Sequence, residues 1–165
     1  MAVSDRIAVM QSGTVVQTGT AEDLYHRPAT RFVAQFIGRA NLVEARVESV
    51  AADKAEVSAL GRRVALEHVR EGLTAGARVR LLLRPEVIAL ARLQDAASEI
   101  TANVVSRTFL GEKIEYLVDC GGEKLQVARH NAGPGDLFAV DERVAIRFAD
   151  DAAILLGDDE GEFAT

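Results

Sequence analysis

The feature that most limits how this chain can fold is a succession of short apolar segments from residue 41 onward, separated by turn-forming residues. Apolar and polar residues alternate within the segments, which recur about every ten to fifteen positions, as half-buried strands do. They are LVEARVESV, KAEVSAL, RVALE, RVRLLLRPEVIAL, EITANVVSRTF, IEYLVDC, EKLQVAR, RVAIRF and AAILL, and the turns contain Gly61, Gly72, Gly76, Gly111, Gly121, Gly122 and the stretch 131–136. Many short strands without a long helical pattern predict a β-barrel or β-sandwich.

The first 40 residues follow a different pattern and begin with a hairpin over residues 5–20, DRIAVMQSGTVVQTGT. Ile7, Val9 and Val15 recur with near alternation, and Gly13 supplies a positive φ in the turn. Two short strands alone are marginal in water and need a further strand or a helix to pack against. We therefore expect this hairpin to lie against other elements or to self-associate with a second chain.

Two short helices are expected after the hairpin. Thr20 is a suitable N-cap, and Asp23 three residues later completes a capping box, so the first helix covers AEDLYHR and stops before Pro28. The second helix is expected over residues 30–38, with Gly38 as its C-terminal cap. Its core-facing side would carry four apolar residues at helical spacing: Phe32, Val33, Phe36 and Ile37. The change of pattern places a boundary near residue 40.

Composition excludes several classes of protein. A net charge of −6 and a pI near 5.1 argue against binding to a nucleic-acid backbone, which needs a clustered basic face. A single cysteine excludes an internal disulfide and a cysteine-based zinc cluster. Because no apolar run is long enough to span a bilayer and no secretory signal is present, we expect a cytoplasmic protein without direct membrane insertion. The acidic residues 158–165 are expected to form a disordered tail.

No complete catalytic or metal-binding set is present in the sequence. The histidines do not lie at metal-ligand spacing from one another or from Cys120, and the serines lack the context of a nucleophile elbow. The residues concerned are His26, His68, His130, Ser12 and Ser106. Cys120 ends an apolar strand and is expected to be a buried, unreactive thiol. We therefore expect no catalytic, cofactor-binding or metal-binding residues in this chain.

The triplet Arg84-Pro85-Glu86 interrupts the most apolar strand of the chain. A proline cannot donate to a strand ladder, so the chain must bend there or reach an edge of the sheet. We expect Arg84 and Glu86 to pair across this bend, mainly as a structural feature. The glycines of CGGEK and NAGPGD precede strands, so we interpret them as hairpin turns and not as a phosphate cradle.

The first 41 residues resemble the end of the ATP-binding cassette of ABC importer ATPase subunits. In that family a strand DRI-VM, a turn glycine and G-I-Q-GT are followed by E-Y--P and FVA-FIG--N. The matching positions are Asp5, Arg6, Ile7, Val9, Met10, Gly13, Val15, Gln17, Gly19, Thr20, Glu22, Tyr25, Pro28, Phe32, Val33, Ala34, Phe36, Ile37, Gly38 and Asn41. Ala21 departs from the pattern, because the family often has proline there.

The remainder resembles the transport-associated OB-like (TOBE) domain that follows the cassette, on LRPEVIAL at 83–90, FLGEKIEYLV at 109–118, LQV at 125–127, Asn131, Gly135, Asp136 and the closing ILL. The resemblance implies a mainly β fold, an OB-like β-barrel preceded by a strand-strand-helix-helix remnant of an α/β ATP-binding cassette. We assign residues 1–40 to the cassette remnant, 41–157 to the TOBE domain and 158–165 to the tail.

The resemblance also implies a function and partners. The intact subunit would dimerise with a second copy, bind Mg-ATP and drive a membrane permease from the inner face of the plasma membrane; polyamines, ferric iron or small organic anions would be its cargo. The chain has no G-x-x-x-x-G-K-[ST] phosphate loop, and in the family this loop, the signature loop and the switch histidine lie upstream of Met1. We expect a truncated, non-catalytic regulatory and assembly fragment without a cofactor of its own.

Two other classes of function stay open at the sequence level. Related small domains bind molybdate-like oxyanions, which need backbone donors or cations arranged around the ion, whereas the basic residues here are scattered. An OB-type nucleic-acid binder is a weaker alternative, because aromatic residues make up only 5% of the chain and few stacking platforms are available.

Overall fold

The computed structural model describes residues 4–69, 72–94, 99–131, 133 and 137–156. It begins with the hairpin β1 (Ile7–Gln11) and β2 (Thr14–Gly19) and two short helices, α1 (Ala21–His26) and α2 (Arg31–Ile37). The strands that follow are β3 (Asn41–Ala51), β4 (Lys54–Ala59), β5 (Arg62–Leu66), β6 (Arg78–Leu83), β7 (Ala89–Arg92), β8 (Ile100–Phe109), β9 (Lys113–Cys120), β10 (Glu123–His130), β11 (Arg143–Arg147) and β12 (Ile154–Leu155), with short 3-10 turns η1 (Pro85–Val87) and η3 (Asp150–Ala152).

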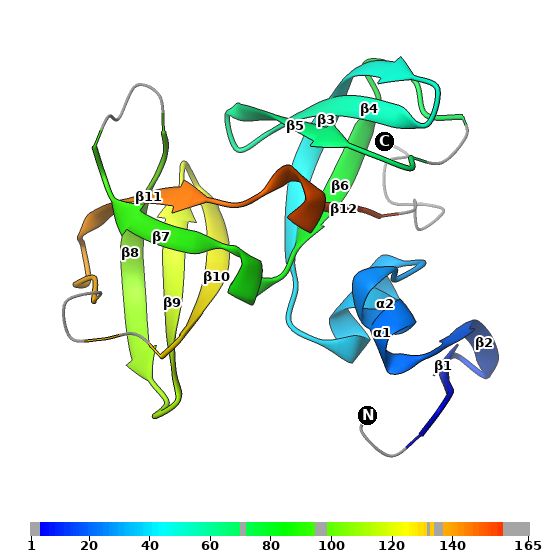
Figure 1. Ribbon diagram of the computed structural model, residues 1–165, viewed down its shortest axis with the longest axis horizontal. Coiled ribbons are helices and arrows are strands. Elements are labelled where there is room, and N and C mark those ends of the chain that lie inside the picture. The colour runs from blue at the N-terminus through cyan, green and yellow to red at the C-terminus, as the bar shows by residue number, and fades with distance from the viewer. Residues whose placement is uncertain (1–3, 70–71, 95–98, 132, 134–136, 157–165) are drawn as a thin grey trace.

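Strands β3 to β12 form two five-stranded antiparallel sheets, in the orders β12-β6-β3-β4-β5 and β10-β9-β8-β11-β7. The chain passes from the first sheet to the second through η1 and returns through η3, so the second sheet is built from the consecutive strands β7 to β11 while the first takes its last strand, β12, from the end of the described chain. Figure 1 shows the two sheets side by side, with α1 and α2 near the end of the β6 strand and the β1–β2 hairpin outermost. Each segment expected to be a strand contains one, which confirms the expected mainly β class.

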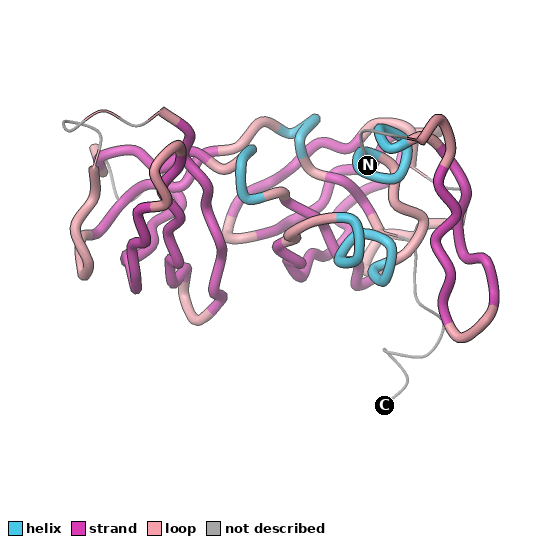
Figure 2. Tube along the Cα trace, turned by 90° about the horizontal axis from the view of Figure 1, so that it is seen from below, coloured by secondary structure: helices cyan, strands magenta, loops and turns pink. Residues whose placement is uncertain are grey.

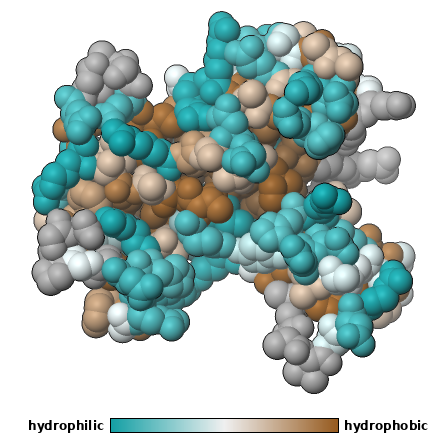
Figure 3. All heavy atoms as spheres, in the orientation of Figure 1, coloured by the Kyte–Doolittle hydropathy of each residue, from teal (hydrophilic) through white to brown (hydrophobic). Residues whose placement is uncertain are grey.

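One apolar core joins the two sheets. In β3, Val43, Ala45 and Val47 are buried while Glu44 and Arg46 between them are exposed, as the two-residue period of a strand requires. The core takes residues from both sheets, among them the buried Tyr116, whose hydroxyl accepts a hydrogen bond from the Phe138 backbone N at 3.4 Å. Figure 2 shows the strongly curled sheets, and Figure 3 shows apolar side chains gathered between them. Two curled half-barrels of this kind fit the expected OB-like fold.

The hairpin forms as predicted, except for the orientation of Val15. Ser12 and Gly13 have φ values of 49° and 80°, as a type I′ turn requires. Gln17 pairs with Val9 and Val15 with Met10, so the register shifts past Val16. This bulge turns Val16 toward the helices and leaves Val15 51% exposed. The near alternation of Ile7, Val9 and Val15 in the sequence therefore does not extend to burial of Val15.

The capping box of α1 is confirmed, because the Thr20 Oγ1 accepts from the Asp23 backbone N at 3.1 Å and the Asp23 carboxylate accepts from the Thr20 backbone N. The hydrogen bonds that the Thr20 hydroxyl and then the Thr20 backbone N–H donate to this carboxylate lower the pKa of Asp23. Two expectations for α2 are wrong. Phe36 is 67% exposed and stacks on Phe32, and the buried pair of this helix is Val33 and Ala34. Gly38 has φ −173°, which is extended backbone and not a left-handed cap.

Helix α2 ends at Ile37 and β3 begins at Asn41, which is where the sequence pattern changes. Residues 158–165, and most of the glycine-rich stretch 131–136, lie outside the described residues. Within the described ranges, neither helix has the length and apolar character needed to cross a membrane.

Candidate functional site

Arg84, at the end of β6, is the most unusual side chain of the described part. It is 3% exposed, and its guanidinium donates to three backbone carbonyls: Nη1 to Ala34 O at 2.8 Å and to Arg39 O at 3.0 Å, and Nη2 to Tyr25 O at 3.1 Å. The carbonyls at the end of a helix have no partner within it, so a cation placed there satisfies them. The residue that directly follows β6 thus bonds to both helices and to the segment that follows them.

Tyr25 and Glu86 complete the surroundings of this guanidinium. The Arg84 Cζ lies 4.2 Å from the centroid of the Tyr25 ring, in cation–π geometry, and the Tyr25 hydroxyl donates to Glu86 Oε1. Burial lowers the pKa of Arg84. Pro85 starts the turn η1, so the expected bend is confirmed. The expected Arg84–Glu86 pairing is wrong: the first residue bonds to helix carbonyls and the second to a tyrosine.

Gly38 and Asn41 pack against the same place. A Cβ at Gly38 would lie 3.3 Å from Tyr25 Cε2 and 3.4 Å from Arg84 Nη1, so the absence of a side chain lets the chain pass close to the guanidinium. Asn41 is 5% exposed and bonds to the backbone of β10, donating from Nδ2 to Gln126 O at 2.8 Å and accepting at Oδ1 from Gln126 N at 2.7 Å. We call Tyr25, Gly38, Asn41, Arg84 and Glu86 the junction.

Sequence reasoning singled out Arg84 but missed the junction as a unit. Tyr25 and Asn41 stood out only as matching positions of the family motif, Gly38 also as an expected helix cap, and the partners of Tyr25 and Asn41 lie far away in the chain. Asn41 could have been recognised from its position, because its polar amide stands at the start of an alternating strand, on the side of the strand that is buried, and a buried amide needs hydrogen-bond partners.

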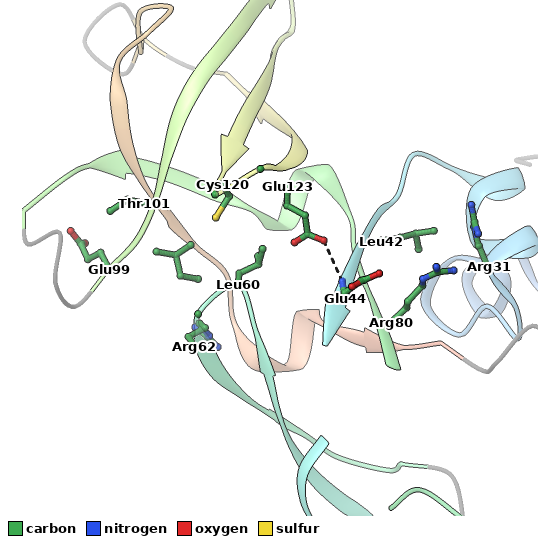
Figure 4. Close-up of a pocket in the computed structure, with 14 residues that line it drawn as sticks. Arg31, Leu42, Glu44, Leu60, Arg62, Arg80, Glu99, Thr101, Cys120 and Glu123 are labelled. Atoms are coloured by element: carbon green, nitrogen blue, oxygen red, sulfur yellow. Dashed lines mark hydrogen bonds between the residues drawn. The ribbon is translucent and has the colours of Figure 1, made fainter. Parts of the chain in front are cut away.

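A second feature is a cleft of about 990 Å³ between the two sheets. Its wall carries both signs of charge, from Glu44, Glu99, Glu123, Arg31, Arg62 and Arg80. Figure 4 shows Arg31 and Arg80 on the side of the helices, Arg62 on the opposite side, and the Glu123 carboxylate accepting a hydrogen bond from the Glu44 backbone N at 3.3 Å. The cleft is large enough for a small polar molecule.

Cys120 lies on the wall of this cleft and is half-buried. Burial, followed by the nearby charges of Glu123 and Asp119, raises the pKa of its thiol. A raised thiol pKa disfavours the thiolate, which is the reactive form. The unreactive thiol expected from the sequence stays a prediction, which the raised pKa favours, whereas the expected full burial is wrong because Cys120 is only half-buried.

Of the remaining sequence candidates, Ser106 and His130 line one groove beside η1, and the others lie apart from them. His26 is the last residue of α1 and meets the Tyr25 ring edge-on, His68 is exposed with its Nδ1 3.3 Å from Asp53 Oδ2, and His130 ends β10. Ser12 lies in the hairpin turn and Ser106 in β8. In the part of the chain that the structure describes, no group of three or more histidine, cysteine, aspartate or glutamate side chains could hold a metal ion.

Comparison with known proteins gives a consistent result. Residues 81–156 match the family model described as the TOBE domain. The chain is 35% identical over 158 residues to the spermidine/putrescine import ATP-binding protein PotA 1 of Pseudomonas aeruginosa, covering 96% of this chain and 42% of that protein. It is 34% identical over 166 residues to PotA of Nitrosomonas eutropha, covering 96% and 45%. The chain thus spans less than half the length of these relatives.

A solved structure with a similar fold is that of the cytoplasmic molybdate-binding protein ModG with molybdate bound. The TM-score is 0.54 at 17% sequence identity, over 78% of this chain and 97% of that chain. At this identity the similarity concerns the fold alone. The family resemblance expected from the sequence is confirmed by the sequence matches and not by this structure.

Proposed function

The chain carries the TOBE domain of ABC importer ATP-binding subunits and matches such subunits over nearly its whole length, and from this premise we propose that it is their regulatory and assembly part. In the intact subunit, ATP hydrolysis would drive uptake through a membrane permease. The names of the relatives favour a polyamine as the cargo. The observation that carries the proposal is the 35% identity spread over 96% of the chain.

We assign residues 1–40 to the end of the ATP-binding cassette, 41–157 to the TOBE domain and 158–165 to an acidic tail. The hairpin and the two helices share a small core of Val9, Leu24 and Val33, separate from the core of the two sheets. The partners in this proposal are a second copy of the subunit and the permease, at the inner face of the plasma membrane. Contacts between proteins do not require a basic face, so the net charge of −6 is compatible with them.

The chain alone is expected to bind no ATP, because none of its sequence supplies a phosphate loop. Mg-ATP would belong to the parent subunit only. Isothermal titration of the chain with Mg-ATP should give no saturable heat. A clear binding isotherm would refute the assignment of a non-catalytic part.

The importer function can be tested with a chimera. In Pseudomonas aeruginosa PotA 1, the part matched by this chain is replaced by the chain itself, and spermidine uptake is measured in cells that lack the native subunit. We expect the chimera to assemble with the permease and to restore uptake. The same chimera without its phosphate-loop lysine is the inactive control. A chimera that folds and hydrolyses ATP but does not associate with the permease would contradict the proposal.

A second candidate function is binding of a small oxyanion in the cleft between the sheets. Arg31, Arg62 and Arg80 line this cleft together with the backbone of the Gly121-Gly122 turn. Cations and backbone N–H groups are the donors that oxyanions need, although three glutamates share the same wall. Equilibrium dialysis with molybdate and with sulfate tests this candidate: retention abolished by Arg80→Met would support it, and equal concentrations on both sides of the membrane would exclude it.

A further inference from the structure

The two buried polar side chains found among the described residues, Asn41 and Arg84, lie at the same place. Asn41 begins β3 and pairs with Leu83 of β6, so Arg84 follows directly after its strand partner. Buried polar groups cost free energy unless they are hydrogen-bonded, and a buried charge costs more. The Asn41 amide and the two terminal nitrogens of Arg84 meet this requirement with bonds that reach across the molecule, whereas the Arg84 Nε has no hydrogen-bond partner.

The bonds made by Arg84 run from the sheets to the helices. Its three acceptors, the carbonyls of Tyr25, Ala34 and Arg39, belong to α1, α2 and the segment leading into β3. Arg84 itself stands at the point where the chain leaves one sheet and enters η1 on its way to the other. A displacement of either helix relative to the sheets must therefore stretch the hydrogen bonds that Arg84 donates to that helix.

A second bond runs in the opposite direction, because the Tyr25 hydroxyl of α1 donates to Glu86 within η1. Asn41 extends the connection to β10 through the Gln126 backbone. A groove lined by Arg39, Glu86 and Glu115 lies beside η1. Within it, Arg39 forms an ion pair with Glu115 of β9. The residues of the junction thus connect both helices, the turn η1 and both sheets around the Arg84 guanidinium.

We propose that the Arg84-Pro85-Glu86 turn is a coupling element that makes the α1–α2 segment and the two sheets move as one body, with Arg84 as its positioning residue. This inference stands independently of the proposed transport function, because it concerns a mechanical connection within the chain. If residues 1–40 do belong to an ATP-binding cassette, this turn is the route by which movement of that cassette reaches the TOBE domain.

The test is hydrogen exchange of the whole chain, measured by mass spectrometry on peptides from the helices and from β8–β10. Arg84→Met keeps the aliphatic stem and removes the donors. Loss of three charge-assisted bonds should raise exchange of the amides of α1 and α2 at least about tenfold, with no change in β8–β10. Arg62→Met is the matched control, because Arg62 also stacks on an aromatic ring, Phe148, and pairs with an acid, Asp150, but touches neither helix.

Gly38→Ala gives a second variant in case the first does not fold. Its extended backbone accepts alanine without strain, and the added methyl would press on Tyr25 and Arg84. We expect several-fold faster exchange in α1 and α2 only. The proposal is overturned if both variants leave helix exchange at the wild-type rate. It is equally overturned if Arg84→Met raises exchange uniformly over the chain, or if Arg62→Met affects the helices to the same extent.

Discussion

Replacing Asn41 by alanine should separate the two sheets at one edge. Strand β10 is the outer strand of its sheet, and the Asn41 amide satisfies the Gln126 backbone N–H and C=O groups on the side away from β9. Alanine would leave both groups without a partner in a partly buried setting. Each fully buried group left unsatisfied costs about 1–3 kcal/mol. Because these two groups are only partly buried, we expect the lower part of the combined range, a loss of about 2–4 kcal/mol in the free energy of unfolding.

Urea unfolding followed by circular dichroism measures this loss. For a chain of this size, the expected loss corresponds to a decrease of about 4 to 16 °C in Tm. Asn103→Ala is the matched control, because Asn103 lies on β8 with its side chain exposed and should change stability by less than about 0.5 kcal/mol. If Asn41→Ala stays within that same margin at an unchanged m-value, the Asn41 bonds do not hold the sheets together.

Three further predictions concern the core, the pH dependence and the hairpin. Leu81→Ala should destabilise the fold by about 2–5 kcal/mol, because Leu81 is fully buried. Leu110→Ala, at an exposed site, should change the stability by less than about 0.5 kcal/mol. Equal effects of the two substitutions in thermal unfolding would refute the assigned core. Hydrogen bonds from Arg39 and then Lys113 lower the pKa of Glu115. The ionised Glu115 carboxylate therefore stabilises the fold above the ordinary pKa of about 4.3, and this stabilisation is lost as the pH falls below that value. Between pH 5 and 3, the wild-type chain should therefore lose more free energy of unfolding than Glu115→Gln. Val15→Lys should weaken self-association in sedimentation experiments, whereas Val140→Lys, at a side chain equally exposed at 51%, should not; a wild-type chain that stays monomeric at high concentration would contradict self-association through the hairpin.

The parts of the fold that could be predicted are those governed by neighbours in the sequence. The strands follow from two-residue alternation, and the cap of α1 follows from Thr20 and Asp23, which lie three residues apart. The exposure of Val15 and Phe36 could not be predicted. A bulge in the hairpin exposes Val15, and α2 buries only Val33 and Ala34, which leaves Phe36 exposed; neither feature leaves a pattern in the sequence.

The junction could not be predicted for a related reason. Arg84 lies 45 to 59 positions away from its three acceptors, and Asn41 lies 85 positions from Gln126. Backbone carbonyls are the same at every residue, so nothing in the sequence distinguishes those that accept from a guanidinium. Arg84 and Glu86 were close in sequence, which favoured the wrong pairing, whereas the fold sends them to different partners.

The pairing of β12 with β6 has a consequence for how such a domain can be exchanged between proteins. The family match begins at residue 81, yet β6 lies between β12 and β3, and the first sheet takes three of its five strands from residues 41–66. A recombination breakpoint at residue 81 would leave the remainder of β6 paired with the two residues of β12, and the apolar side of Leu81 and Leu83 would lose its cover. A breakpoint between Ile37 and Asn41 would preserve both sheets. The unit that evolution can shuffle intact is therefore longer than the segment that sequence similarity marks out.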